Sequence, residues 1–296
     1  MRSYRPLINH STEVMAPASA NAMLTIADTC AAVRADIERS GNAGELSYFN
    51  LHERRFRVTA ARVLELVPKQ AEILDIGGHY LHLSCIVGLL GYRVSAIDVP
   101  AFAELPFVVE RATRRGIALT TVESDDIAAG RFLPQHTNRF DAVLFCEILE
   151  HITFNPIAFW RRVHELLRPK GTIVLTTPNS LKLLSILGAL WNLVSLRRIG
   201  LSVKQIMHHD TFGHHWKEYS SREIKEYFGR LSPDFQVRVR KLDYGPPTSD
   251  VREQLGAVRT AILQLGNATG FFAESLEAVI TLPQKTPWRV QMPTSG

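Results

Sequence analysis

The chain has 296 residues, of which 46% are hydrophobic and 21% charged, with a formal net charge of +5 and a pI of about 9.2. This composition is ordinary for a soluble globular protein and argues against a disordered chain. The basic excess is too small to indicate nucleic-acid binding, and basic residues such as Arg54, Arg55 and Arg57 are dispersed as on a solvated surface.

Two helices are predicted ahead of the first strand. Residues 1–20 have no apolar periodicity and are expected to form a loose arm. Apolar residues at helical spacing then predict helices over 22–40 and about 52–67. We interpret them as an N-terminal helical cap, which divides the chain into an arm and cap, 1–68, and a second unit, 69–296.

Strands and helices alternate after the cap, with short connections, which predicts an α/β fold with a doubly wound parallel sheet. The predicted strands are short apolar runs bounded by turn residues, at 72–76, 93–97, 118–122, 140–145, 172–176, 235–242 and 277–282. The predicted helices lie at 81–90, 103–116, 156–167, 221–231 and 251–265. Ser220 is the expected N-cap of the fourth of these helices, with Glu223 completing a capping box.

One insertion, at about 180–218, interrupts this alternation. Its first part, 180–201, is unusually apolar and helical in pattern, and a histidine-rich stretch follows. A helical lid over the substrate pocket is our functional interpretation. A helix packed on the body, on a second copy in a homodimer, or on a membrane surface remains an alternative. Three further histidines are expected to face water, namely His208, His209 and His214.

Cysteine usage and the missing targeting signals predict a cytoplasmic location. Cys30, Cys85 and Cys146 lack the spacing of a metal site or a disulfide framework. The first residues lack the apolar core and cleavage site of a signal peptide. The longest apolar run, 183–196, is interrupted by polar residues and is too short to span a bilayer. We expect no transmembrane segment.

The first two strands carry a nucleoside-binding layout. Asp75, Gly77 and Gly78 supply a turn that lets the backbone approach a ligand, and Asp98 supplies a carboxylate for ribose hydroxyls. A dinucleotide site is the alternative. It is weaker because the chain has no full G-x-G-x-x-G sequence.

The fourth strand leads into a cluster of titratable side chains, in the sequence FDAVLFCEILEH at 140–151. If a helix starts there, Glu147, Glu150 and His151 gather on its first turn, near the end of the strand at Cys146. Two carboxylates and an imidazole at the mouth of a sheet need a cation, a proton or a substrate.

The motifs ILDIGG, SAIDV, SDDI, FDAVLFCEILEH and LLRPKGTIVLTTPN, over roughly 70–230, resemble those of class I S-adenosylmethionine-dependent methyltransferases. The resemblance implies a Rossmann-like seven-stranded sheet, with an antiparallel final strand beside the fifth, and S-adenosyl-L-methionine as cofactor. It implies that Asp126 and Ile127 approach the adenine and Cys146 the methionine end. The chain departs from the family where His79 and Leu81 replace glycines, and His79 is expected over the cofactor.

The E-x-x-E-H sequence is similar to that of two metal-binding branches of this family, the small-RNA 2′-O-methyltransferases and the ubiquinone-pathway O-methyltransferases. Downstream, H-W-K-E-Y-S at 215–220 resembles the segment that holds a further histidine ligand in the RNA branch, and the H-W-R-E-Y-T of polysaccharide-cluster methyltransferases. The resemblance implies Mg²⁺ (or Mn²⁺) held by Glu147, Glu150, His151 and His215, with His151 or His215 as the catalytic proton acceptor. Alternatively, Glu150 and His151 only cap a helix.

We therefore predict an S-adenosylmethionine-dependent O-methyltransferase, assisted by a divalent metal, that methylates a hydroxyl of a sugar or saccharide. The expected partner is a small-molecule or oligosaccharide acceptor, and no nucleic acid. Two other enzymes remain open, an RNA-end 2′-O-methyltransferase and a quinone or phenol O-methyltransferase. A catalytically silent protein with the cofactor fold is the alternative from another class.

Overall fold

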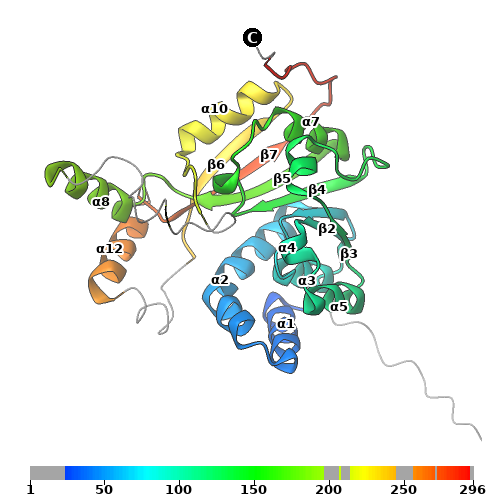
Figure 1. The fold of residues 1–296 in the computed structure, drawn as a ribbon, viewed down its shortest axis with the longest axis horizontal. Coiled ribbons are helices and arrows are strands. Elements are labelled where there is room, and N and C mark those ends of the chain that lie inside the picture. The colour runs from blue at the N-terminus through cyan, green and yellow to red at the C-terminus, as the bar shows by residue number, and fades with distance from the viewer. Residues whose placement is uncertain (1–23, 197–206, 208–213, 245–255, 271, 294–296) are drawn as a thin grey trace, which may run out of the picture.

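The computed structural model describes residues 24–196, 207, 214–244, 256–270 and 272–293 (Figure 1). Seven strands form one sheet in the order β3-β2-β1-β4-β5-β7-β6. Their bounds are β1 (Glu72–Ile76), β2 (Arg93–Asp98), β3 (Ala118–Thr121), β4 (Phe140–Cys146), β5 (Leu167–Pro178), β6 (Gln236–Leu242) and β7 (Ser275–Thr281). β7 runs antiparallel to both of its neighbours, β5 and β6. The predicted Rossmann-like sheet is confirmed.

Helices cover both faces of the sheet. In Figure 1, α7 and α10 lie above it and the helices from α1 to α5 below it. The helices below are α1 (Ile26–Ser40), α2 (Ala43–Leu66), α3 (His82–Leu89), α4 (Pro100–Ala103) and α5 (Pro106–Arg115). The rest are α6 (Ser124–Ala128), the 3-10 turn η1 (Leu149–His151), α7 (Ile157–Leu166), α8 (Leu183–Val194), α10 (Ser221–Leu231) and α12 (Ala257–Ala268).

The predicted cap helices share one core with the sheet. Phe49, Phe56 and Val63 of α2 belong to the same buried cluster as Ile86 of α3 and Ala142 of β4. Burying these side chains stabilises the cap and the sheet together, because neither surface is left exposed to water. The division of the chain at residue 68 stays a prediction.

Several helices differ from their predicted bounds: α1 begins at Ile26 rather than at 22, and α12 ends at Ala268 rather than at 265. Two larger differences have a local cause. α2 begins at Ala43 rather than near residue 52, because the Asn42 side chain accepts a hydrogen bond from the backbone N–H of Glu45 at 3.1 Å and caps an earlier turn. The helix expected over 103–116 is two helices, α4 and α5. Pro106 begins the second, and Leu105 before it is extended, as a residue preceding proline prefers.

The capping box of Ser220 and Glu223 is confirmed at the start of α10. The predicted arm at 1–20, His208, His209 and the ends of two predicted helices, at 197–201 and 251–255, lie outside the described residues. Among the helices that the structure describes, none has the length and apolar content needed to cross a membrane.

Candidate functional site

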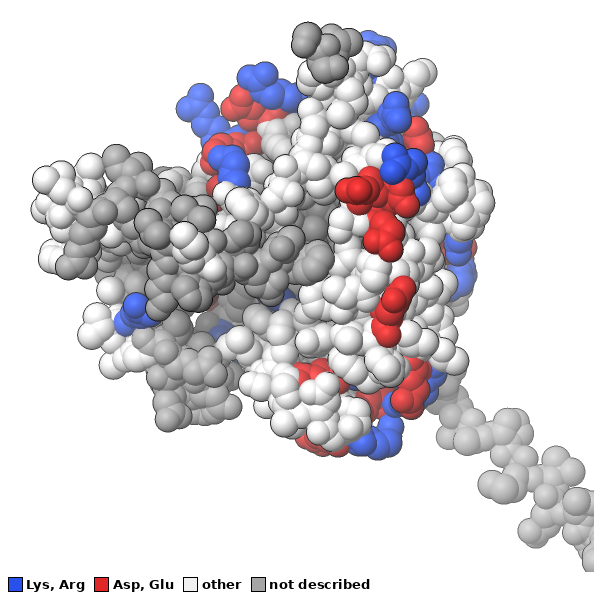
Figure 2. All heavy atoms as spheres, viewed as in Figure 1, with Lys and Arg blue, Asp and Glu red and all other residues white. Residues whose placement is uncertain are grey.

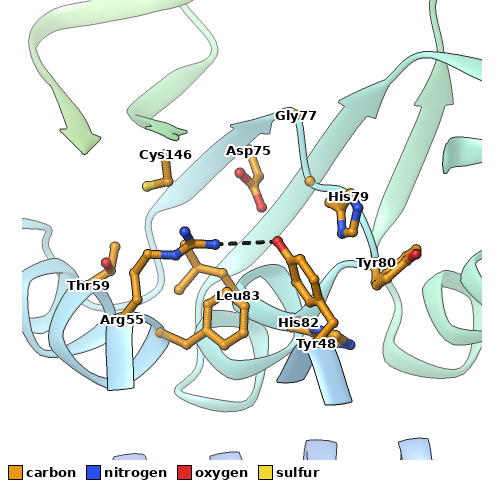
Figure 3. Close-up of a pocket in the computed structure, with 12 residues that line it drawn as sticks. Tyr48, Arg55, Thr59, Asp75, Gly77, His79, Tyr80, His82, Leu83 and Cys146 are labelled. Carbon is orange, nitrogen blue, oxygen red and sulfur yellow. Dashed lines mark hydrogen bonds between the residues drawn. The ribbon is translucent and has the colours of Figure 1, made fainter. Parts of the chain in front are cut away.

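A cleft of about 1470 Å³ opens where β1, β2 and β4 end. Most of the predicted site residues line it, namely Gly77, His79, Asp98, Ile127, Cys146, Glu147, Glu150, His151 and His215. Asp75 and Gly78 line a smaller adjoining pocket of about 50 Å³ (Figure 3). Asp126 does not line either pocket, and its carboxylate pairs with Arg131 at 2.7 Å. The strand ends therefore bring all but one of the predicted residues to this region.

The turn after β1 keeps a left-handed backbone even where glycine is replaced. The φ angles are 75° at Gly77, 50° at His79 and 61° at Leu81. Left-handed φ is costly for residues with a Cβ, so the surroundings must hold the turn. The Leu81 side chain is fully buried, and the His79 ring packs on Tyr80 with 3.8 Å between ring centroids. The turn therefore keeps its shape with His79 and Leu81 in place of glycines, and the rings of His79 and Tyr80 line the cleft.

Gly77→Ala is expected to destabilise the protein and to prevent cofactor binding. A Cβ at this position would lie 2.3 Å from Cδ1 of Ile148, and the backbone is left-handed. The left-handed backbone costs roughly 1–2 kcal/mol, and displacing the end of the Ile148 side chain adds less, so the melting temperature falls by roughly 2–8 °C. Thermal unfolding measures the change. Gly229→Ala is the matched control, because a Cβ there meets open space; an equal loss in both variants would contradict the argument.

Two buried carboxylates flank this turn. Asp98 accepts backbone hydrogen bonds from His79 at 2.6 Å and from Val99 at 2.7 Å. Asp75 accepts a hydrogen bond from the Ser84 hydroxyl at 2.5 Å. Burial raises the pKa of each aspartate to about 6, and Asp98 contributes to the rise at Asp75. Both groups are therefore ionised at neutral pH, and Asp98, which lines the cleft, can accept hydroxyl hydrogen bonds.

Asp75→Asn is expected to raise the melting temperature of the ligand-free protein more at pH 7 than at pH 4. The pKa of Asp75 rises from an ordinary value of 3.8 to about 6 in the folded state. The native state thus binds the proton more tightly than the unfolded state, so the contribution of Asp75 to stability falls as pH rises through that range. The amide stays neutral and avoids this loss. A difference in melting temperature that does not vary with pH would contradict the prediction.

One face of α2 supplies side chains that sequence reasoning missed. Tyr48, His52, Arg55 and Thr59 lie at helical spacing and all line one or both pockets. Figure 3 shows Arg55 and Tyr48 pointing toward each other below Asp75 and Cys146. The Arg55 guanidinium lies 3.4 Å from the Tyr48 hydroxyl oxygen. The prediction that Arg55 is a solvated surface residue is therefore wrong, and the signal that could have found it is this polar stripe on a helix.

The same guanidinium pairs with Glu147, whose carboxylate oxygen lies 3.5 Å away. Burial acts to lower the pKa of Arg55, but Glu147, Tyr48, Tyr244 and Cys146 act together in the opposite direction, and the net pKa is raised. Arg55 is therefore a permanent, largely buried cation, with its side chain 17% exposed, beside the methionine end predicted for the cofactor at Cys146. A ligand carboxylate in this pocket would find an arginine already desolvated.

The cluster after β4 has a different local structure from the one predicted. Glu147 has a left-handed φ of 58°, and its backbone N–H still bonds to the carbonyl of Thr176 in the sheet. A 3-10 turn, η1, begins only at Leu149. Glu147, Glu150 and His151 therefore do not share the first turn of a helix, because the strand ladder extends past Cys146 and the chain then turns sharply.

Three of the four proposed metal ligands nevertheless come together. Glu150, His151 and His215 each offer one ligand atom, and these atoms all lie within 4.8 Å of one another. The segment that carries His215 is held in place by the backbone N–H of Trp216, which donates to the carbonyl of Glu150 at 2.8 Å. Glu147 lies outside this group and faces Arg55.

Each histidine of the cluster has one nitrogen engaged on its outer side. His151 Nδ1 lies 2.9 Å from the carbonyl oxygen of His214, so this nitrogen carries the proton and Nε2 keeps its lone pair. His215 Nδ1 lies 3.2 Å from Glu218, which also binds Lys182 at 2.7 Å. Metal-binding histidines are usually oriented by such outer hydrogen bonds. Sequence reasoning missed Glu218 and Lys182 in this role.

The carboxylates of the cluster are incompletely satisfied. Glu150 receives a hydrogen bond from the Thr177 hydroxyl at 2.8 Å, but its Oε1 is buried and has no hydrogen-bond partner among the described residues. Oε1 of Glu147 is in the same situation. Burial, followed by the charge of Glu147, raises the pKa of Glu150 to about 8. These buried carboxylate oxygens are costly to keep charged unless a proton or a cation is bound beside them.

Comparison with known proteins gives matches in sequence and in fold. The family described as "Methyltransferase domain" matches residues 51–232, more than half of the chain. The Ubiquinone biosynthesis O-methyltransferase of Xanthomonas campestris pv. campestris (strain B100) is 32% identical over 110 residues, which are 37% of this chain and 44% of that protein. The chain thus matches less than half the length of this curated relative.

Two solved structures share the fold. Phosphoethanolamine N-methyltransferase 2 from Haemonchus contortus, in complex with S-adenosyl-L-methionine, has a TM-score of 0.53 at 14% identity, covering 85% of this chain and 60% of that chain. The 1,6-didemethyltoxoflavin-N1-methyltransferase of Burkholderia thailandensis, with bound 1,6-didemethyltoxoflavin and S-adenosylhomocysteine, has a TM-score of 0.50 at 16% identity, covering 93% and 99%. At these identities the likeness concerns the fold alone. With the class I methyltransferase order of its sheet and the family match over residues 51–232, this chain belongs to the methyltransferase-domain family.

Proposed function

We propose that this methyltransferase transfers the methyl group to one oxygen of a vicinal pair of hydroxyls on a sugar or saccharide, with a divalent cation holding the pair. The observation that carries the proposal is the grouping of Glu150, His151 and His215 in the cleft, with ligand atoms within 4.8 Å of one another. Carboxylates with imidazoles suit Mg²⁺ or Mn²⁺, and they leave coordination positions for two substrate oxygens.

The residues present fit such a cation. The unpaired Oε1 of Glu150 lies 4.0 Å from His151 Nε2, which is too long for a hydrogen bond between them. An ion bound by both atoms would satisfy the buried oxygen and neutralise its charge. We include Glu147 as a fourth ligand because its buried Oε1 also lacks a hydrogen-bond partner among the described residues.

A bound cation would lower the pKa of the acceptor hydroxyl and orient its oxygen. The residues of the chain mainly provide position, because methyl transfer needs the oxygen, the methyl carbon and the sulfur in line. Asp98 and Arg55 are proposed to hold the ribose and the methionine carboxylate of the donor. With a cation bound, His151 and His215 would be its ligands and the acidified hydroxyl would release its proton to water; without it, the His151 Nε2 lone pair can accept that proton.

A quinone or phenol acceptor is the second candidate. It is favoured by the match to Ubiquinone biosynthesis O-methyltransferase, which is 32% identical over 110 residues. A catechol presents the same chelating pair of oxygens as a sugar diol. The RNA-end alternative has less support, because acidic and basic residues are interspersed on the face shown in Figure 2, with no basic stripe among the described residues drawn there.

The proposal is tested by measuring formation of S-adenosylhomocysteine with a panel of acceptors. The panel contains monosaccharides with a vicinal diol, their deoxy analogues, a catechol and a short RNA duplex. We expect turnover with a diol, loss of turnover with its deoxy analogue and with EDTA, and recovery with Mn²⁺. Turnover that is equal with and without EDTA, or with and without the second hydroxyl, would exclude the chelated-diol mechanism. No turnover with any acceptor would favour the catalytically silent alternative.

We also propose a cytoplasmic location. Cys30, Cys85 and Cys146 are all free thiols, and the first two are buried. Unpaired cysteines are typical of proteins in a reducing compartment. The homodimer through the insertion remains a prediction, which analytical ultracentrifugation of the full chain tests.

A further inference from the structure

Three helices place a buried cluster of polar side chains beside the turn that follows β1. The cluster consists of Glu45 of α2, His82 of α3 and Arg111 of α5, whose side chains are 0%, 1% and 3% exposed. Oε1 of Glu45 lies 2.8 Å from Nε2 of His82 and 2.5 Å from Nη1 of Arg111. Neither Glu45 nor Arg111 lines the cleft or the smaller pocket. We call these three residues the Glu45 cluster.

The contacts within the Glu45 cluster determine its charges. Burial acts to raise the pKa of Glu45, but the hydrogen bonds and the electrostatic influence of His82 and Arg111 together outweigh it, and the net pKa is lowered. Burial lowers the pKa of His82, so its ring is neutral at neutral pH and its Nε2–H donates to Glu45. The cluster is therefore an ion pair of Glu45 and Arg111, with a neutral histidine bound to the same carboxylate oxygen.

The Glu45 cluster contacts the turn at two points. Its guanidinium donates a hydrogen bond to the carbonyl oxygen of Tyr80 at 2.7 Å, and His82 is itself the first residue of α3. These two contact points alternate with His79 and Leu81, whose φ angles of 50° and 61° are left-handed. The carboxylate of the cluster binds both the guanidinium and the imidazole, so it links α2 and α5 to the turn on each side of Leu81.

The shape of this turn depends on its surroundings, because residues with a Cβ adopt a left-handed backbone only where the neighbouring structure holds it. The backbone N–H of His79 donates to the carboxylate of Asp98 at 2.6 Å, and the side chain of Leu81 is fully buried. His79 and Tyr80 both line the cleft (Figure 3). A change in the position of the Tyr80 carbonyl would therefore move the wall that faces the cofactor.

Stability alone does not account for the Glu45 cluster. Taking two charges out of water is costly, so well-packed apolar residues often stabilise a core as much as a buried ion pair does. Oε2 of Glu45, Nδ1 of His82 and Nε of Arg111 are also buried without a hydrogen-bond partner among the described residues. Directional contacts to the turn are what this cluster provides and apolar residues would not.

We propose that Glu45 is a positioning residue for S-adenosylmethionine, which holds the turn of residues 77–82 in the conformation that binds the donor. It does so together with the other two residues of its cluster, at a turn where His79 and Leu81 lack the conformational freedom of glycine. Glu45 acts through the turn, because it does not line the cleft itself. The proposal concerns binding of the donor and depends neither on the metal cluster nor on the acceptor, so it can fail while the proposed function stands.

The test is calorimetric titration of the full chain with S-adenosylmethionine after both charges of the Glu45 cluster are removed. In the double variant Glu45→Met with Arg111→Met, affinity is expected to fall by about tenfold, the factor that corresponds to the strain of one left-handed residue. The matched control is Arg62→Met with Glu277→Met. It removes another buried pair, at 2.9 Å between α2 and β7, and neither residue lines the cleft. Its affinity for S-adenosylmethionine is expected to stay unchanged.

A second comparison separates positioning from general stabilisation. In a His79→Gly background, the change of Glu45 and Arg111 to methionine is expected to lower affinity by only about threefold, because glycine adopts a left-handed backbone without help. A cluster that only stabilised the fold would cost the same factor in both backgrounds. Melting temperatures of the ligand-free variants verify that each is folded at the temperature of the titration.

Three results would overturn the proposal. They are an unchanged affinity in the double variant at Glu45 and Arg111, an equal loss in the control, and the same loss with His79→Gly as without it. If the double variant does not fold, Glu45→Asp takes its place. It keeps the charge but draws the carboxylate away from its two partners, so a smaller loss of affinity is expected, and wild-type affinity in Glu45→Asp would equally overturn the proposal.

Discussion

Glu150→Gln is expected to lower kcat and to weaken Mn²⁺ binding by about 100-fold each, while S-adenosylmethionine binding changes little. The amide keeps the shape of the side chain and the hydrogen bond from Thr177, but it cannot supply the carboxylate that a cation would bind beside His151 and His215. Turnover measures the first effect, and calorimetric titration with Mn²⁺ measures the second. Calorimetric titration with S-adenosylmethionine verifies that the cofactor half of the cleft is intact.

The control for this variant is Glu110→Gln, an exposed glutamate on α5 that pairs with Arg114 and lies outside the cleft. His151→Ala and His215→Ala are expected to match Glu150→Gln in both measurements. Glu218→Gln keeps every proposed ligand but weakens the contacts of Glu218 with His215 and Lys182, so a loss of about tenfold is expected. Wild-type Mn²⁺ affinity and turnover in Glu150→Gln would remove the metal site and leave the methyltransferase assignment untouched.

Arg55→Met is expected to weaken binding of S-adenosylmethionine by roughly 10- to 100-fold, the factor that corresponds to a lost charge-assisted hydrogen bond. The guanidinium lies beside Cys146 and Asp75, in contact with Tyr48 and Glu147, and it offers a largely buried cation to the carboxylate of the donor. Methionine fills a similar volume without charge. Calorimetric titration of the variant with S-adenosylmethionine measures the change.

A ligand without the carboxylate separates this role from general damage to the pocket. 5′-Methylthioadenosine lacks the amino-acid part of the donor, so its affinity should fall much less in Arg55→Met than that of S-adenosylmethionine. Arg57→Met is the matched variant, because Arg57 pairs with Glu53 at the protein surface and lines neither pocket. Equal losses for both ligands, or an unchanged affinity for S-adenosylmethionine, would contradict the assignment of Arg55.

The local pattern of apolar and turn residues in the sequence was sufficient to predict most of the fold. The apolar runs that became β1, β4 and β5 are buried on both faces of a parallel sheet, and such strands contain few polar residues to obscure the pattern. The glycine turn and the capping box of Ser220 also depend on neighbours within a few residues. Helix ends were less predictable, since the cap at Asn42 and the break at Pro106 moved boundaries that apolar periodicity alone cannot locate.

The candidate site could be predicted only in part, and Glu147 illustrates why. Its spacing to Glu150 and His151 suggested one helical turn, but the sheet ladder continues to Thr176 and the backbone turns left-handed at Glu147. Its carboxylate therefore faces Arg55, a residue more than ninety positions earlier. Spacing along the chain predicts neighbours only when the secondary structure has been assigned correctly.

The sequence by itself determined the α/β fold and the nucleoside-binding layout, because strand periodicity, the glycine turn and the acidic residues at strand ends are local and lie in a regular order; the methyltransferase family followed from the resemblance of its motifs. Only the tertiary structure decided which side chains meet. Packing of α2 on the sheet buried Arg55 and left Arg57 in solvent, and a backbone hydrogen bond from Trp216 to Glu150 brought His215 to a cluster more than sixty residues away. Contacts of this kind depend on how faces of distant elements pack, and no pattern of neighbouring residues encodes them.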